Sequence, residues 1–163
     1  DVEAVDVGVD RATLAHVGHI GPTPRDMTEA QMSLHHAIGM RLTAGGNDPS
    51  HYARFEKGLD AAAAASRVRL HVDDEAEALF PGRLLAEVTV HTTAGARTVR
   101  VEAPGTPTTP MGRDVRLEKF HALADPIVGE DDATRLVAAV DALADGGPVS
   151  GVLIHTRKAH SPV

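Results

Sequence analysis

One segment, residues 105–120, constrains the backbone more than any other part of the chain. It reads Gly-Thr-Pro-Thr-Thr-Pro-Met-Gly-Arg-Asp-Val-Arg-Leu-Glu-Lys-Phe. Gly105 tolerates a positive φ, whereas Pro107 and Pro110 fix φ at about −65°. The segment follows two alternating runs and leads into a helical pattern that begins at Asp114. We therefore expect a Gly/Pro-rich crossing from a β-hairpin to a helix, which points to an architecture more than to a reaction.

Four runs alternate hydrophobic and polar residues with the period of two that is typical of strands. They cover residues 2–9, 67–72, 84–92 and 97–102. The last two runs are separated by Ala94-Gly95, so a hairpin is the economical interpretation.

Helical periodicity and helix start and stop signals predict four helices. They cover residues 29–43, 49–65, 114–128 and 131–144. Residues 73–81 are expected to form an acidic connection. The order β-α-α-β-β-β-α-α predicts an α+β fold with a small antiparallel sheet covered by helices. We expect one domain over residues 1–147 and a C-terminal tail over residues 148–163.

The composition excludes several classes of function. The 163 residues carry a net charge of −7 and lack the basic patch of a nucleic-acid-binding protein. They contain no cysteine, so disulfides and thiolate catalysis are absent. No apolar run is long enough for a membrane span, and the first residues do not resemble a signal peptide. We therefore expect a cytoplasmic protein that binds neither nucleic acid nor membranes.

No complete catalytic set or cofactor motif is present. The chain has ten histidines, but none form His-x-x-x-His on an expected helix. His35 and His36 are adjacent and diverge by about 100° on a helix, so they cannot both bind one metal ion. Nucleotide-binding glycine patterns and the Gly-x-Ser-x-Gly elbow are also missing. We therefore expect neither a metal nor a cofactor.

Three segments resemble the C-terminal part of the MmgE/PrpD family. Residues 24–39 resemble the family's Pro…Glu-Ala-(Lys/Gln)-Phe-Ser-x-x-Tyr-x-x-Ala helix, and residues 67–74 its following strand. Residues 105–110, with Lys119-Phe120 on the next helix, resemble its Gly-x-Pro-x-x-Pro…Lys-Phe signature. The three matches occur in the family's order and extend over nearly the whole chain.

The resemblance implies a fold and a chemistry. The family includes 2-methylcitrate dehydratase, cis-aconitate decarboxylase and iminodisuccinate epimerase, which act on small di- and tricarboxylates without a metal. Its active site lies between a large helical domain and a smaller α+β lid. This sequence resembles only the lid and the closing C-terminal helix. We therefore expect part of a lyase or isomerase that works with a helical-domain partner chain or as a homo-oligomer. Two alternatives are a non-catalytic binding or dimerisation module and a small stand-alone acid–base enzyme.

The resemblance also implies a site on the helix expected over residues 29–43. His36 stands where the family usually has Tyr and is the candidate catalytic acid/base, since imidazole titrates near neutral pH. The alternative is a buried structural histidine bonded to a backbone carbonyl. Gln31, Ser33 and His35 are candidates for binding the substrate carboxylates. A solvent-facing glutamine and a serine bonded to its own helix are the structural alternatives.

Overall fold

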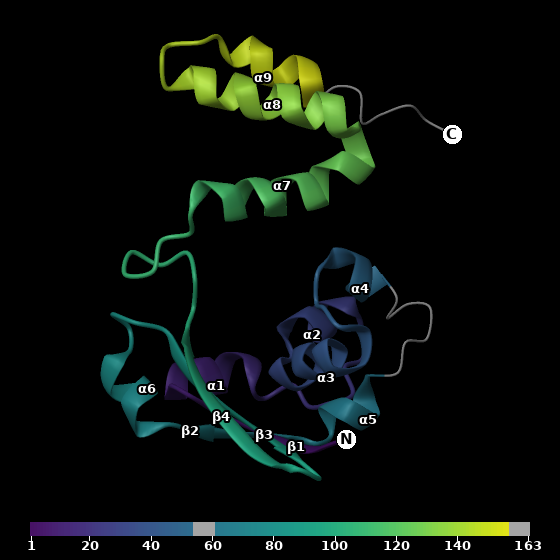
Figure 1. Cartoon of the computed structure of the whole chain (residues 1–163), viewed down its shortest axis with the longest axis vertical. Coiled ribbons are helices and arrows are strands. Elements are labelled where there is room, and N and C mark those ends of the chain that lie inside the picture. Colours follow the sequence, from purple (N-terminus) through teal and green to yellow (C-terminus); the bar gives the residue numbers. More distant parts are fainter. Residues whose placement is uncertain (54–60, 157–163) are drawn as a thin grey trace. The chain divides into compact units, whose positions relative to one another are not determined.

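The computed structural model describes residues 1–53 and 61–156. It divides into two compact units, Asp1–Pro110 and Met111–Val163, so the boundary lies within the Gly/Pro-rich segment (Figure 1). The domain limits expected from the sequence, 1–147 and 148–163, stay a prediction.

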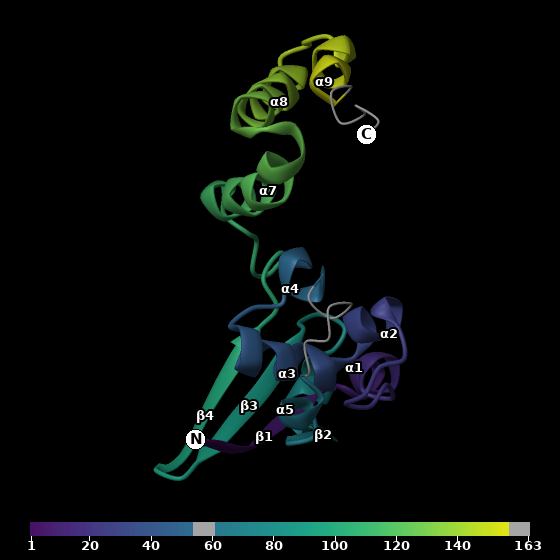
Figure 2. The ribbon, with the colours of Figure 1, turned by 90° about the vertical axis from the view of Figure 1, so that its right-hand side faces the viewer.

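A four-stranded sheet forms the base of the first unit. It contains β1 (Val2–Val9), β2 (Val68–Val72), β3 (Leu85–Thr92) and β4 (Gly95–Glu102) in the order β2-β1-β3-β4 (Figure 2). The predicted α+β class is confirmed, and all four expected strands are present. The prediction of an antiparallel sheet was wrong, because β1 and β2 are parallel while the other two pairs are antiparallel. The long helical connection between β1 and β2 is the kind of crossover that parallel pairing requires.

The two faces of the sheet differ in polarity. Val5, Val7 and Val9 of β1 are buried on one face, together with Val68 of β2. Helices cover this face, and Leu34 and Ile38 pack against the valines. Because side chains alternate along a strand, the residues between the valines lie on the opposite, polar face.

Six helices lie in the described part of the first unit. They are α1 (Arg11–Val17), α2 (Met27–Met32), α3 (Leu34–Ala44), α4 (Pro49–Ala53), α5 (Ala62–Ala65) and α6 (Asp74–Leu79). The helix expected over residues 49–65 is represented by α4 and α5, and residues 54–60 lie outside the described residues.

Two of these helices contradict the sequence-based expectations. Helix α1 was missed, and α6 occupies the segment expected to be an acidic connection. Both start at an aspartate: Asp10 accepts a 2.8 Å hydrogen bond from Thr13 N, and Asp73 accepts one of 2.9 Å from Ala76 N. An N-cap of this kind stabilises a short helix that hydrophobic periodicity alone does not reveal.

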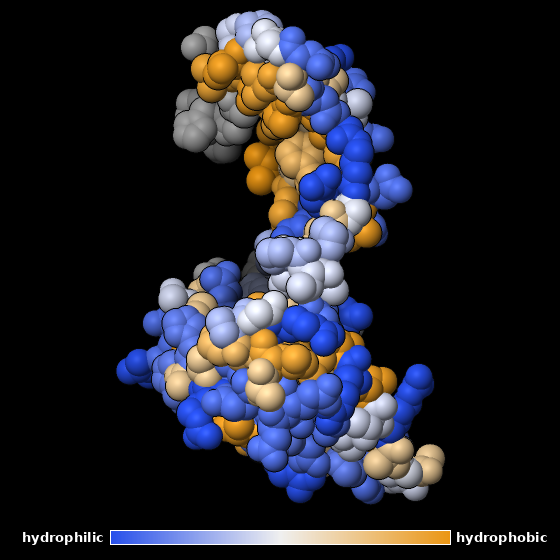
Figure 3. Space-filling model, turned by 90° about the vertical axis from the view of Figure 1, so that its left-hand side faces the viewer, coloured by the Kyte–Doolittle hydropathy of each residue, from blue (hydrophilic) through white to orange (hydrophobic). Residues whose placement is uncertain are grey.

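The second unit is helical. It contains α7 (Arg113–Val128), α8 (Glu130–Leu143) and α9 (Val149–Thr156). Helices α7 and α8 agree with expectation, whereas α9 lies in the segment expected to be a tail. A groove of about 330 Å³ between α7 and α8 is lined mainly by hydrophobic side chains, and Figure 3 shows such residues gathered on one side of this unit. None of the described helices is both long and apolar enough to cross a bilayer.

Candidate functional site

The predicted site residues flank a break between two helices. Ser33 ends α2 and begins α3 with extended backbone angles, φ −93° and ψ 115°. Its hydroxyl oxygen accepts a 3.0 Å hydrogen bond from His36 N, so Ser33 is the N-cap of α3. The single helix expected over residues 29–43 was therefore wrong: the serine side chain competes with continuous helical hydrogen bonding at this position.

Ser33 also attaches α3 to a preceding loop. Its hydroxyl lies 3.1 Å from the carbonyl oxygen of Ile20 and 3.0 Å from that of Gly21, and donates to them. Only 1% of the Ser33 surface is exposed. The candidate substrate-binding hydroxyl is thus engaged inside the chain by both its donor and its acceptor capacity.

His35 bonds to the same loop. Its Nδ1 lies 3.2 Å from the carbonyl oxygen of Ile20, and the ring is half-buried. Because a carbonyl only accepts, Nδ1 carries a proton in this contact, and Nε2 is the ring nitrogen left for a second contact. We call residues 20–22 the anchor loop, since Ser33, His35 and His36 all contact its backbone.

His36 is the most deeply enclosed of the candidates. It is 2% exposed, in the row of buried α3 residues that includes Gly39 and Met40. Burial lowers the pKa of the His36 imidazole, and a hydrogen bond with the backbone of Pro22 partly opposes that shift. The ring is therefore neutral near pH 7 and able to accept a proton. Burial and a backbone bond are also the features expected of a structural histidine.

Gln31 is the exposed member of the candidate set. It lies in the last turn of α2, before the break at Ser33. The start of this helix is held by Asp26, which accepts from Glu29 N at 2.9 Å, and by the ion pair between Glu29 and Arg25. That guanidinium lowers the pKa of the Glu29 carboxyl. Gln31 therefore projects from a helix whose first turn is well fixed.

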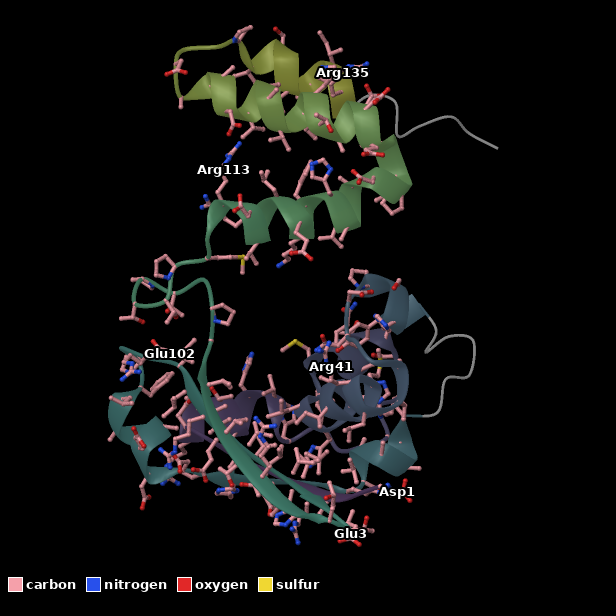
Figure 4. All side chains as sticks on the ribbon, viewed as in Figure 1. Asp1, Glu3, Arg41, Glu102, Arg113 and Arg135 are labelled. Atoms are coloured by element: carbon pink, nitrogen blue, oxygen red, sulfur yellow. The ribbon has the colours of Figure 1, made fainter. Side chains whose placement is uncertain are left out.

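A groove on the covered face of the sheet is lined by other residues of α3. Its volume is about 470 Å³, and its hydrophobic lining includes Leu34 and Ile38 of α3 and Val88 of β3. The carboxylates that line it are Asp10 and Glu102, the latter at the end of β4 (Figure 4). None of the four predicted site residues is in its described lining. Both carboxylates already have partners, since Asp10 caps α1 and Glu102 pairs with Arg83.

The polar face of the sheet carries a cluster that sequence reasoning did not assemble. Asp6 accepts hydrogen bonds from Arg69 at 2.6 and 3.0 Å and lies 2.7 Å from Nε2 of His91. The bond from Arg69 is the largest of the effects that lower the pKa of Asp6. The three residues come from β1, β2 and β3, so only the strand registers bring them together. The alternation of side chains along each strand predicts that all three residues lie on the polar face. It does not predict that they are neighbours, because that depends on how the strands are aligned.

Within the residues that the structure describes, no group of three His, Asp or Glu side chains is arranged to hold a metal ion.

Among curated proteins, no match to this chain is found. The family profile described as "MmgE/PrpD C-terminal domain" matches residues 1–145, which is most of the chain. The chain therefore belongs to the MmgE/PrpD family, and what it carries is the C-terminal domain of that family.

Proposed function

We propose that this chain is the lid of an MmgE/PrpD-type, metal-independent lyase or isomerase that acts on a small di- or tricarboxylate. The family match over residues 1–145 is the observation that carries this proposal. The reaction would be dehydration, decarboxylation or epimerisation next to a carboxylate, in the cytoplasm. Catalysis would require a helical domain, supplied by a partner chain or another part of the protein.

In this proposal His36 is the general acid/base that transfers a proton to or from the substrate carbon next to a carboxylate. Its lowered pKa supports a neutral imidazole at the working pH, which is the form that a general base requires. Because His36 is buried, a substrate can reach the ring only after part of the surrounding chain moves, and in this proposal the part that moves is the anchor loop. Gln31, exposed beside the break, would donate its amide N–H to a substrate carboxylate.

Ser33 and His35 have a different place in the mechanism. Ser33 would act as a positioning residue, since its hydroxyl already bonds the anchor loop and caps α3. His35 would use Nε2 toward the substrate while Nδ1 holds Ile20. Both side chains therefore couple the position of the anchor loop to the position of His36.

Reconstitution tests the proposed function. The chain is mixed with the helical domain of an MmgE/PrpD protein, and consumption of 2-methylcitrate, cis-aconitate and iminodisuccinate is followed. We expect activity only in the mixture, and a decrease in kcat of about 10²-fold or more for His36→Gln, as for other general bases. Arg41→Gln, an exposed change on the same helix, is the matched control. A folded, stably bound complex without activity on any of these acids would contradict the proposal.

A second candidate is a non-catalytic module that binds an acid or mediates dimerisation. The near-complete burial of His36 favours it, because an unmoving buried ring cannot contact substrate. Calorimetric binding of a tricarboxylate without turnover in the reconstituted complex would support this candidate over the enzyme.

A further inference from the structure

The segment over residues 103–110, which leads from β4 toward α7, has little backbone freedom (Figure 1). It contains Pro104, Pro107 and Pro110. Each proline fixes its own φ at about −65° and holds the residue before it in an extended conformation. Only Gly105 and Thr108 of this segment are neither a proline nor the residue before one. Its conformation therefore depends on what holds these two residues.

Hydrogen bonds hold both of them. Gly105 adopts a positive φ of 88°, and its N–H donates to the carbonyl oxygen of Thr109 at 2.7 Å. Thr108 Oγ1 donates to Oε1 of Glu102 at 2.7 Å, while Oε2 of the same carboxylate accepts from Arg83 at 2.6 and 2.9 Å. The bonds from Arg83 and then Thr108 lower the pKa of the Glu102 carboxyl. Thr108 is thus attached to the end of β4 through an ion pair.

A cluster of threonine hydroxyls closes the segment on itself. Thr109 Oγ1 donates to the carbonyl oxygen of Ala103 at 2.8 Å, and Thr109 N donates to Thr106 Oγ1 at 3.1 Å. Thr106 Oγ1 also lies 2.7 Å from Thr109 Oγ1 and 3.0 Å from Thr108 Oγ1. Thr108 and Thr109 already donate their hydroxyl protons elsewhere, so Thr106 is the donor in these contacts. Ala103 N donates to the carbonyl oxygen of Leu84 at 2.8 Å, which attaches the start of the segment to the sheet.

The connection loosens directly after this cluster. Neither Pro110 nor Met111 forms a hydrogen bond with any of the described residues. Gly112 is the N-cap of α7 but supplies no side-chain cap, and a Cβ on it would have no atom within 4 Å. Met111 is not followed by a proline, and glycine is the residue with the widest choice of backbone angles. The boundary between the two units falls between Pro110 and Met111.

We propose that residues 102–109 form a rigid bracket fixed to the sheet, and that residues 110–112 are the hinge at which the two units turn relative to each other. Within the hinge, Pro110 keeps only its ψ angle, while Met111 and Gly112 keep both soft backbone angles. That this motion opens and closes a lid rests on the proposed function. The position of the hinge does not.

The bracket limits how far the units can separate. If residues 103–112 were flexible throughout, their extended length would be about 35 Å. A hinge of three residues spans at most about 10 Å. The motion that remains is mainly rotation about a point close to the end of β4, so the units change their orientation more than their separation.

Backbone ¹⁵N relaxation of the full chain tests both parts of the proposal. We expect order parameters of about 0.85 for Gly105, Thr108 and Thr109, as in the sheet, and values below about 0.6 for Met111 and Gly112. Equally low values from residue 105 to residue 112 would overturn the bracket. Values of about 0.85 throughout, with one rotational correlation time for both units, would overturn the hinge.

Thr109→Val tests what makes the bracket rigid. Valine keeps the shape of the side chain but removes its hydroxyl bonds to Ala103 and Thr106. We expect the order parameters of Gly105 and Thr108 to fall toward that of Met111. Thr93→Val, which changes an exposed threonine in the turn between β3 and β4, is the matched control and should leave them unchanged. A folded Thr109→Val variant with unchanged order parameters would contradict the role of the cluster.

Gly112→Pro tests the hinge. The φ of Gly112 is −59°, which already suits proline, and its N–H donates to none of the described residues. Proline at this position also restricts Met111, so the rotational correlation times of the two units should converge. Gly112→Ala, the matched control, should leave them distinct. Independent tumbling that persists in a folded Gly112→Pro variant would overturn the assignment. These measurements need no turnover, so an inactive reconstituted complex would count against the proposed function and not against the hinge.

Discussion

At the scale of single residues, His36 should make the stability of the chain depend on pH. Burial lowers its pKa in the folded chain below the value of about 6.5 expected when unfolded. Between these two pKa values the unfolded chain binds a proton that the folded chain does not. The free energy of unfolding should therefore decrease as the pH falls below about 6.5.

The variant His36→Gln removes this contribution. In urea unfolding between pH 5 and 7.5, the free energy of unfolding should decrease more steeply with falling pH in the wild type than in the variant. His16→Gln, which changes an exposed histidine, is the control and should follow the wild type. Parallel curves for wild type and His36→Gln would show that the imidazole of His36 does not titrate differently on folding.

Gly39 is a residue for which alanine should be worse despite its higher helix propensity. A Cβ on Gly39 would lie 2.7 Å from the carbonyl oxygen of Ala61 and 2.8 Å from Cβ of Ala65. Alanine gains about 1 kcal/mol in helix propensity, but forcing α3 away from α5 costs about 1–3 kcal/mol. We expect Gly39→Ala to lower the free energy of unfolding in chemical denaturation. Gly21→Ala, where no atom lies within 4 Å of the new methyl group, should have little effect.

At the scale of elements, the break between α2 and α3 should be sensitive to the loss of one hydroxyl. Ser33→Ala removes the α3 N-cap and the bonds to Ile20 and Gly21. We expect the free energy of unfolding to decrease by about 1–2 kcal/mol. Ser33→Thr keeps the hydroxyl, so its free energy of unfolding should decrease less than that of Ser33→Ala. If Ser33→Ala lost activity in a reconstituted enzyme without any loss of stability, Ser33 would be a direct substrate ligand instead.

Helix α6 should depend on a single arginine of the sheet. Arg100 bonds Asp73 and Glu75 at the start of α6 and Glu87 of β3. Arg100→Met leaves these carboxylates close together, so we expect a loss of about 1 kcal/mol, larger at low salt than at high salt. Thermal unfolding at several salt concentrations measures it. Arg97→Met is the matched control, since Arg97 forms no ion pair with the described residues, and a salt-independent loss at Arg100 would contradict an electrostatic role.

The sequence was informative about elements with strong periodicity and uninformative about short ones. Strands over residues 2–9 and 67–72, and the helix after Asp114, could be predicted because each has a regular apolar pattern. The short helices α1 and α6 could not, since a capping aspartate stabilises each. The parallel pairing of β1 and β2 depends on a crossover that no local pattern specifies. At the site, adjacency placed Ser33, His35 and His36 near one another, but their shared contact with residues 20–22 is tertiary.

At the scale of the whole molecule, the two units differ in how well they bury hydrophobic side chains. Among the described hydrophobic residues of the second unit, Ala133 is the one that is fully buried. Larger side chains of this unit are exposed: Val115 by 53%, Ile127 by 69% and Leu153 by 50%. The first unit has two hydrophobic clusters built on Val5, Val7 and Met40. A segment of about 50 residues with so little burial is marginal alone.

Fragments test this difference. We expect residues 1–110 to unfold cooperatively in thermal denaturation, and residues 111–163 to show a weak, non-cooperative helical signal by circular dichroism. Adding a family helical domain should raise the helicity of the second fragment if its exposed side chains are a docking surface. A cooperative transition of residues 111–163 alone would show that the small core is sufficient.

The anchor loop has a thermodynamic consequence for any ligand of His36. Three side chains of one short segment contact the backbone of residues 20–22, so an opening of this loop breaks all three contacts in the same event. The open form is then a minor conformer, and a ligand's apparent affinity is reduced in proportion to how seldom that conformer is occupied. Molecules that offer replacement acceptors for the released hydroxyl and imidazole groups recover part of the loss. Selectivity for acids with several carboxylates would then arise from the opening step rather than from a preformed pocket.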